Sequence, residues 1–222
     1  GVGANVFRWT ISNGPCTPTT TFDEVTILIY DFDQPAANAG PDQFLCSPTL
    51  NTQLAANNAF FPATGAWTLI SGSGIIANPT SSASLVSGLA VGENIFRWTI
   101  SNGPCSGSLT TNDVSIFVFD SNAPAANAGT DQSICSPANS VTMFANSAIF
   151  PGVGTWTLVS GSGSITSPNS PTSLINNLGI GENIFQWSIN NGACGSQTTT
   201  DLVSIFVFSQ FSPSAHAGID QD

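Results

Sequence analysis

The chain has 222 residues, of which 41% are hydrophobic and only 7% carry a charge, and its 13 acidic residues face two arginines, giving a formal net charge of −11. Such a surface repels phosphate backbones and anionic membranes, so nucleic-acid binding is not expected. No apolar run approaches the ~18 residues that would span a bilayer, which argues against membrane insertion of this segment. Fifteen phenylalanines and five tryptophans supply a core, so the chain should be globular.

An interval of 89 residues separates equivalent landmarks along the whole chain. Residues 93–105 (ENIFRWTISNGPC) and 182–194 (ENIFQWSINNGAC) align without a gap, and the tryptophans recur as Trp9, Trp98 and Trp187. This regularity indicates a tandem array cut within a repeat at both ends, so the parent protein is expected to be longer. The predicted division is a truncated C-terminal part (1–34), two complete β-sandwich repeats (35–123 and 124–212) and the first strand of a further truncated repeat (213–222).

The elements of one repeat follow in chain order. An extended linker and a first edge strand (35–46) precede a short strand (53–56), a loop, a strand at 66–71, two short strands before residue 94, and long strands at 94–101 and 114–119. We expect Trp67 and Leu69 to face inward in the strand at 66–71. About seven strands without an amphipathic helix, with turn signals every 8–12 residues, predict an all-β fold of tandem immunoglobulin-like sandwiches.

The long strands alternate large apolar residues. Phe96, Trp98 and Ile100 share one face, which we assign to the core, and the same inward position of Trp67 disfavours sugar stacking. The last strand is apolar on both faces, although a half-solvated strand should be polar on one of them. The extra apolar face carries Phe117, Phe119, Phe206 and Phe208. Either a loop or the linker covers these rings, or they contact the next domain or another chain.

The cysteines follow the repeat, one after each DQ pair and one in each Asn-Gly turn. Regular pairs in small β-domains favour structural disulfides and an oxidising compartment. The simplest arrangement, with each repeat self-contained, joins Cys46 to Cys105 and Cys135 to Cys194. A second arrangement would staple neighbouring units through Cys16–Cys46 and Cys105–Cys135, and a third would use a longer-range pairing such as Cys46–Cys194. The chain has no metal-binding cysteine motif.

Acidic side chains offer the other candidate chemistry. Asp42 and Asp131 recur in the DQ pair, with Asp220 as a third copy, and the structural interpretation is that these carboxylates accept backbone N–H bonds. Calcium is a weak alternative, with Asp23, Glu24 and Asp113 as further oxygen donors, because these donors change from repeat to repeat. His216, the only histidine, stands where other copies have asparagine, so it is not expected to be a base. We predict no catalytic residue and no cofactor.

Three segments carry a resemblance to a known class of repeats: NAGPDQFLC (38–46), WTLISGSG (67–74) and FRWTISNGPC (96–105). They resemble the PKD-like or immunoglobulin-like repeats of giant surface proteins in Bacteroidota, including gliding-motility adhesins exported by type IX secretion. The resemblance implies an extracellular, disulfide-bearing array on the bacterial cell surface. It implies as partners the neighbouring repeats, the secretion machinery and, in a filament, other copies. It brings no catalytic residue.

The sequence therefore favours a non-enzymatic stalk or filament that spaces an adhesive region from the cell and contributes to attachment or gliding. A binding module for surface glycans or proteins is the alternative, with loops 58–64 and 147–153 as the divergent candidates. A third hypothesis is an accessory array on a secreted hydrolase.

Overall fold

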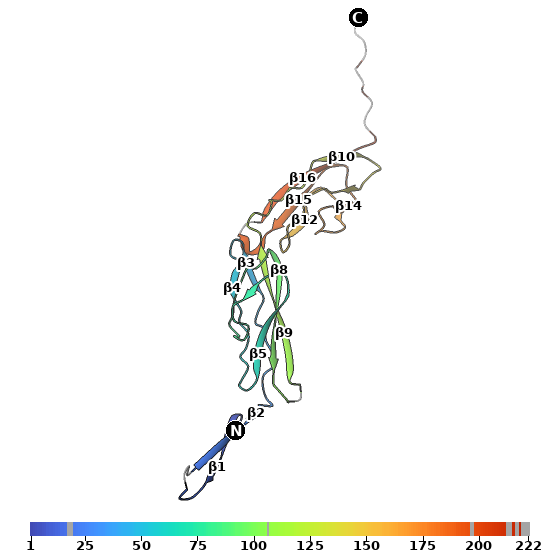
Figure 1. The fold of residues 1–222 in the computed structure, drawn as a ribbon. Helices are drawn as coiled ribbons and strands as arrows, with labels where there is room; N and C mark the ends of the chain where they lie inside the picture. Colours follow the sequence, from blue (N-terminus) through green and yellow to red (C-terminus); the bar gives the residue numbers. More distant parts are fainter. Residues whose placement is uncertain (17–19, 106, 196–197, 212–214, 216–217, 219–222) are drawn as a thin grey trace. The chain divides into compact units, whose positions relative to one another are not determined.

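The computed structural model describes residues 1–16, 20–105, 107–195, 198–211, 215 and 218 (Figure 1). Apart from one short 3-10 helix, η1 (Gly192–Cys194), the regular structure in these residues is β-strand, which confirms the predicted fold class. The chain divides into two compact units, Gly1–Val118 and Phe119–Asp222. The four-part division made from the repeat stays a prediction.

Unit 1 holds a hairpin and a sandwich. The hairpin pairs β1 (Gly3–Ser12) with β2 (Thr20–Ile29). The sandwich strands are β3 (Gln43–Cys46), β4 (Asn51–Gln53), β5 (Thr64–Ser71), β6 (Ile75–Ile76), β7 (Leu85–Ser87), β8 (Gly92–Ser101) and β9 (Leu109–Phe119). They form a four-stranded sheet in the order β3-β9-β8-β5 and a three-stranded sheet in the order β4-β7-β6. The predicted first strand, β3, therefore does lie at a sheet edge.

Unit 2 repeats this arrangement. Its strands are β10 (Gln132–Cys135), β11 (Val141–Thr142), β12 (Val153–Ser160), β13 (Ser164–Ile165), β14 (Leu174–Asn176), β15 (Gly181–Asn190) and β16 (Thr199–Phe208). The sheets have the orders β10-β16-β15-β12 and β11-β14-β13. The first strand, β10, runs parallel to the last, β16, whereas β15 is antiparallel to both of its neighbours. Two sheets of this topology form an immunoglobulin-like sandwich.

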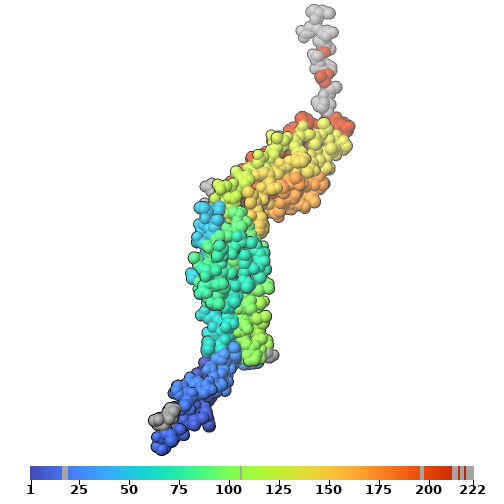
Figure 2. All heavy atoms as spheres, in the orientation of Figure 1, coloured from blue at the N-terminus to red at the C-terminus, as the bar shows by residue number. Residues whose placement is uncertain are grey.

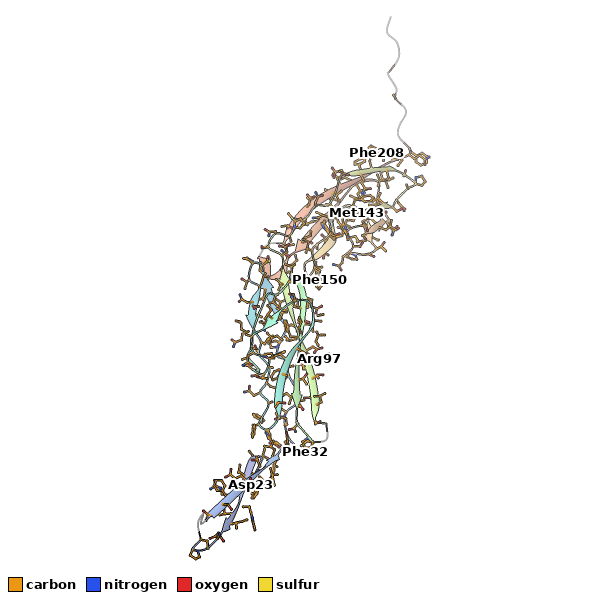
Figure 3. All side chains as sticks on the ribbon, in the orientation of Figure 1. Asp23, Phe32, Arg97, Met143, Phe150 and Phe208 are labelled. Carbon is orange, nitrogen blue, oxygen red and sulfur yellow. The ribbon has the colours of Figure 1, made fainter. Side chains whose placement is uncertain are left out.

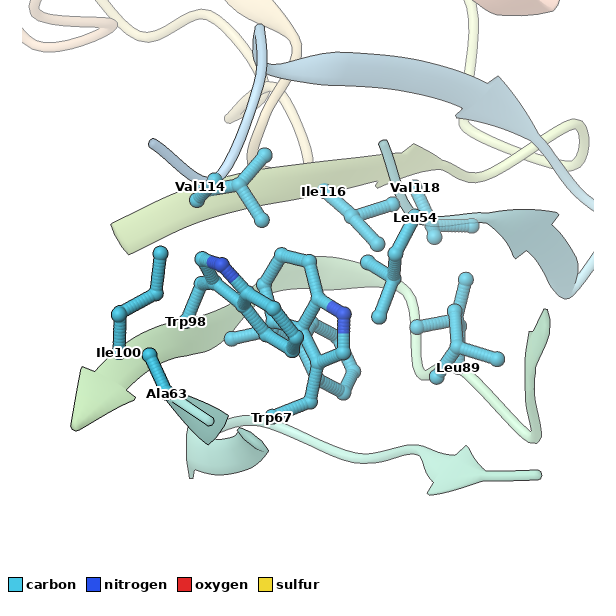
Figure 4. Packing of buried hydrophobic residues seen from close by; sticks show 12 residues of the cluster. Leu54, Ala63, Trp67, Leu89, Trp98, Ile100, Val114, Ile116 and Val118 are labelled. Carbon is cyan, nitrogen blue, oxygen red and sulfur yellow. The ribbon is translucent and has the colours of Figure 1, made fainter. Parts of the chain in front are cut away.

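A pair of tryptophans fills the centre of each sandwich, and Figure 4 shows the pair of unit 1. In unit 1 the rings of Trp67 and Trp98 are tilted, with centroids 5.1 Å apart, and both side chains are buried. Gly65 lies so close to Trp98 that any Cβ there would overlap the ring, which explains the glycine. Phe96 and Ile100 are buried on the same face, as predicted from the alternation. Tilted aromatic pairs of this kind add about 1 kcal/mol to the effect of burial.

The prediction for Leu69 is wrong. Its side chain is 39% exposed, although Trp67, two residues earlier in β5, is buried. The pairing of β5 with β8 shifts register between Leu69 and Ser71, so a bulge interrupts the alternation. A bulge disrupts the strand ladder locally, so the alternation expected for this strand ends at Leu69.

The large apolar side chains of the β1–β2 hairpin are exposed. The hairpin is dark blue in Figure 2. Trp9 is 74% exposed, whereas Trp98 at the equivalent position of the sandwich is 1% exposed. The sequence pattern is the same in both places, so burial here depends on the sheet packed opposite the strands.

Among the described residues, no helix is both long and apolar enough to cross a membrane.

Candidate functional site: the Asn-Gly turn and the strand end it holds

The segment before each sandwich, predicted to be a linker, is hydrogen-bonded along the last strand of that sandwich. In unit 1 the backbone N–H of Ala37 donates to Thr110 Oγ1 and that of Ala39 to Asn112 Oδ1, both at 2.8 Å. In unit 2 the equivalent donors, Ala126 and Ala128, use Thr199 Oγ1 at 2.9 Å and Asp201 Oδ2 at 2.8 Å. The change from Asn112 to Asp201 is tolerated because only an acceptor oxygen is needed.

At the start of this segment, an aromatic ring lies on the Asn-Gly turn between the two long strands. Gly103 has a positive φ of 60°, and a Cβ there would lie 2.5 Å from two carbons of the Tyr30 ring. Beside it, Asn102 Nδ2 donates to the backbone oxygen of Asp31 at 2.6 Å. Glycine is needed here for two reasons, because the left-handed conformation disfavours a side chain and the ring occupies its space.

Unit 2 reproduces these contacts with a different aromatic residue. A Cβ on Gly192, whose φ is 47°, would run into the ring of Phe119, and Asn191 Nδ2 donates to the Asp120 oxygen at 2.6 Å. Cys194 Sγ, on the same turn, lies 3.1 Å from the Phe119 oxygen. We call this arrangement the turn latch, made of Tyr30, Asp31, Asn102 and Gly103 in unit 1 and of Phe119, Asp120, Asn191 and Gly192 in unit 2.

The four phenylalanines predicted as an interface have different surroundings. Phe117 stacks on Phe44, with ring centroids 5.4 Å apart and planes within 11°. Phe119, in the turn latch, is only 7% exposed. Phe206 and Phe208 contact each other at 4.6 Å and are 41% and 52% exposed. Phe44 thus covers Phe117, and the Asn-Gly turn of Gly192 covers Phe119. An interface role for these residues stays a proposal.

Asp42 and Asp131 both accept backbone hydrogen bonds. Their Oδ1 atoms receive the N–H groups of Ser115 and Ser204, each at 2.8 Å, which ties the start of each sandwich to its last strand. In the part of the chain that the structure describes, no three histidine, cysteine, aspartate or glutamate side chains gather to hold a metal ion. Asp220 and His216 lie outside the described residues. These hydrogen bonds agree with the interpretation that the two carboxylates accept backbone N–H groups.

The cysteines do not pair within each repeat. Cys46 and Cys194 are disulfide-bonded, whereas Cys16, Cys105 and Cys135 are free, so both the first and the second arrangement are wrong.

The strand register explains why Cys135 and Cys194 do not bond to each other. Cys135 lies opposite Phe208, at the far end of β16 from the turn that carries Cys194. Ten residues of strand span roughly 30 Å, far beyond the about 7 Å between Cα atoms that a disulfide allows.

Both arginines make cross-strand ion pairs, Arg8 with Glu24 and Arg97 with Asp113. Arg97 Nε and Nη2 donate to the two carboxylate oxygens of Asp113 at 2.7 and 2.9 Å. These hydrogen bonds, together with the positive charge, hold the pKa of Asp113 below its usual value and raise the pKa of Arg97. In unit 2, Gln186 faces Leu202 in the same register, so both charges are replaced together. The pair is a local strand contact, since one repeat lacks it entirely.

A surface recess of about 530 Å³ lies beside the loop predicted as a binding candidate. Its lining includes Phe60 and Phe61, whose side chains are 56% and 65% exposed, together with the hydroxyl-bearing residues Thr80 and Ser82. The recess thus combines exposed aromatic rings with hydroxyl groups.

Sequence reasoning missed the turn latch and a buried asparagine. Asn94 is 1% exposed: its Oδ1 accepts from Ser73 N at 2.9 Å, and its Nδ2 donates to the oxygens of Ala90 and Ile116. Asn183 makes the same contacts in unit 2. The available signal was the recurrence of both motifs, ENIF and Asn-Gly, at the 89-residue interval.

No protein-family profile and no curated protein matches the chain. Among solved structures, the PKD domain of the KIAA 1837 protein is 24% identical over 44% of this chain and 96% of its own, with a TM-score of 0.35. The PKD domain of human KIAA0319 is 22% identical, with coverages of 38% and 80% and a TM-score of 0.33. An I-band fragment of titin is 14% identical, with coverages of 92% and 74% and a TM-score of 0.40. The class of the fold rests on the strand topology: a tandem immunoglobulin-like β-sandwich.

Proposed function

We propose that the chain is a non-enzymatic part of the extracellular stalk or filament of a large adhesin on a bacterial surface. In this role it spaces or displays an adhesive region and contributes to attachment or gliding. The observation that carries the proposal is the turn latch, because the same four-residue arrangement recurs where one sandwich segment leads into the next. What recurs between the units builds and joins sandwiches, whereas the arginine–carboxylate ion pairs of unit 1 are replaced by Gln186 and Leu202 in unit 2.

The contacts of the linker support a spacer. Its backbone N–H groups donate to side chains of the following sandwich at 2.8–2.9 Å in both units. These hydrogen bonds restrict the conformations of the linker. The length of the array should therefore grow steadily with the number of repeats. We propose neighbouring repeats and the type IX secretion machinery as partners, on the resemblance of the repeat motifs.

Solution X-ray scattering on chains that carry one, two and four added copies of residues 124–212 tests this role. A strand of about eight residues spans roughly 27 Å, and loops with a linker bring each repeat to about 40 Å. The maximum dimension should therefore rise by a constant increment with each copy. A dimension that stays the same as copies are added would contradict a spacer.

A glycan-binding role is the second candidate, favoured by the recess at Phe60 and Phe61. Aromatic faces beside hydroxyl groups suit a sugar, whose C–H face packs on a ring while its hydroxyls hydrogen-bond. A glycan array probed with the chain and with the Phe60→Ser/Phe61→Ser variant separates the two roles. Binding that the variant loses would support this candidate, and no binding on a broad array would contradict it.

A further inference from the structure

The turn latch depends on an amide group that is chemically labile. Asn102 and Asn191 each precede a glycine, which has no side chain to keep its backbone nitrogen from the carbon of the asparagine amide. Asn-Gly pairs therefore lose ammonia more readily than other asparagine pairs. In unit 1 the group that leaves is Nδ2 of Asn102, the same atom that donates to the backbone oxygen of Asp31 at 2.6 Å.

This hydrogen bond lies where the chain leaves the hairpin strand β2, which ends at Ile29. Phe32, the residue after Asp31, is labelled in Figure 3 and is 77% exposed. The segment is therefore held by the Asn102 amide and by the ring of Tyr30 on the turn, and not by packing of Phe32.

The product of deamidation does not fit the latch. Asn102 is 7% exposed, and its Oδ1 is buried without a hydrogen-bond partner among the described residues. Replacing the amide nitrogen by oxygen puts a carboxylate against the backbone oxygen of Asp31, and neither group has a proton to donate. A buried charge without a partner is strongly unfavourable. The latch of unit 1 therefore does not close on an aspartate.

The two latches differ in how the attacking nitrogen is held. In unit 2 the N–H of Gly192 donates to Asn190 Oδ1 at 2.8 Å. The residue equivalent to Asn190 in unit 1 is Ser101, and in the part of the chain that the structure describes the Gly103 N–H has no acceptor. Attack requires this nitrogen to turn towards the amide carbon, so the hydrogen bond of Gly192 has to break first. Of the two latched asparagines, Asn102 is the less protected.

We propose that Asn102 is a site of spontaneous deamidation, and that the reaction opens the turn latch of unit 1 permanently, whereas Asn191 is protected. A buried, hydrogen-bonded asparagine reacts only when the latch opens locally, so the loss of ammonia traps the open state. The rate at each asparagine then reports how often its latch opens. This inference does not rest on the spacer role.

The reaction needs water as its only other reactant. The backbone nitrogen of Gly103 attacks Cγ of Asn102, the N–Cγ bond forms, and the Cγ–Nδ2 bond breaks. The proton of the glycine N–H leaves with ammonia, which gives a cyclic succinimide. Water then adds to either carbonyl of the ring and opens it to aspartate or isoaspartate. No electrons are transferred.

Exchanging the residues that distinguish the two turns tests the site. The whole chain is kept at mildly alkaline pH in heavy-oxygen water, and peptide mass spectrometry follows Asn102 and Asn191 in the same sample. Asn102 should react faster. Asn190→Ser, a change at an exposed residue, should raise the rate at Asn191 about fivefold, the factor that one neutral hydrogen bond gives, and leave Asn102 unchanged. Ser101→Asn should slow Asn102. Equal rates at the two asparagines, or no response to either exchange, would overturn the proposal.

The dependence on the latch is tested with Tyr30→Ala. Losing the contact of a half-buried ring should raise the rate at Asn102 about tenfold, with Asn191 in the other unit as the internal control. Hydrogen exchange of the β8 amides distinguishes local opening from unfolding of unit 1, because only unfolding accelerates both. An unchanged rate at Asn102 would show that the latch does not protect it.

The effect of the product is measured on Asn102→Asp and on deamidated chain separated by ion exchange. The ring of Tyr30 lies against Gly103, so its ring current shifts the proton NMR signals of the Gly103 Hα atoms. Both samples should lose this shift, whereas Asn51→Asp, at an exposed asparagine of the same unit, should keep it. A shift that persists in the deamidated chain would show that the reaction leaves the latch closed.

Discussion

Replacing Gly103 with alanine is the sharpest perturbation of the turn latch. The change places a Cβ 2.5 Å from two carbons of the Tyr30 ring, so the ring has to move away. An L-residue at φ of 60° costs about 1 kcal/mol by itself, and displacing a half-buried aromatic ring adds about 1–2 kcal/mol. We therefore expect the variant to lower the stability of unit 1 by about 2–3 kcal/mol.

Gly88→Ala is the matched control within the same unit. Gly88 has a φ of 69°, but a Cβ there would meet no atom within 4 Å, so only the backbone cost of about 1 kcal/mol remains. Asn177, the equivalent residue of unit 2, already has a φ of 59° with a side chain present, which shows that this conformation is accessible.

Hydrogen exchange of the β8 and β9 amides in increasing urea measures the effect, because it reports on unit 1 separately from unit 2. The double variant Tyr30→Ala/Gly103→Ala should lose less than the sum of the single changes, since the clash disappears with the ring. Equal destabilisation by Gly103→Ala and Gly88→Ala, or strict additivity in the double variant, would refute the ring contact.

Three further changes probe the core and the ion pair. Asn183→Leu leaves three backbone groups, one in β16 and two in loops, without their hydrogen-bond partners. The variant should lower the free energy of unfolding of unit 2 by about 2–4 kcal/mol, measured by urea denaturation. The same substitution at an exposed asparagine should lower it only slightly. Gly154→Ala drives a Cβ into the ring of Trp187 and should cost about 1–3 kcal/mol, with a shift in tryptophan fluorescence. Arg97→Gln should raise the pKa of Asp113 towards its ordinary value in a carboxyl NMR titration. Because the folded-state pKa of Asp113 is depressed, its contribution to stability is present above the unfolded pKa and fades as the pH falls through the folded one. Both partners are about 40% exposed, so that contribution should be small.

The sandwich could be predicted from the sequence because side chains along a strand of a sandwich alternate between the core and the solvent. Phe96, Trp98 and Ile100 are buried together as the alternation requires, and the carboxylate of Asp42 accepts a backbone N–H as its place beside a strand suggested. Alternation failed at Leu69, where a bulge shifts the register without any signal in composition.

The cysteines and the turn latch could not be derived in the same way. Self-contained pairing is the simplest arrangement in a repeat, but the parallel packing of the first strand on the last puts the two cysteines at opposite ends. The latch joins Asn102 to Asp31 across 71 residues, and no periodicity of the sequence encodes so distant a contact. Its trace in the sequence is the repeated Asn-Gly dipeptide, which by itself signals only a turn.

The contact between turn and ring is the central claim, and the proton NMR shifts of the glycine Hα atoms test it most directly. The Hα atoms of Gly103 and Gly192 lie against the rings of Tyr30 and Phe119, whereas Gly14, in an equivalent turn, has no neighbour within 4 Å of its Cβ position. Ring currents should move the Hα signals of Gly103 and Gly192 upfield of those of Gly14. Similar shifts for all three glycines would contradict the turn latch.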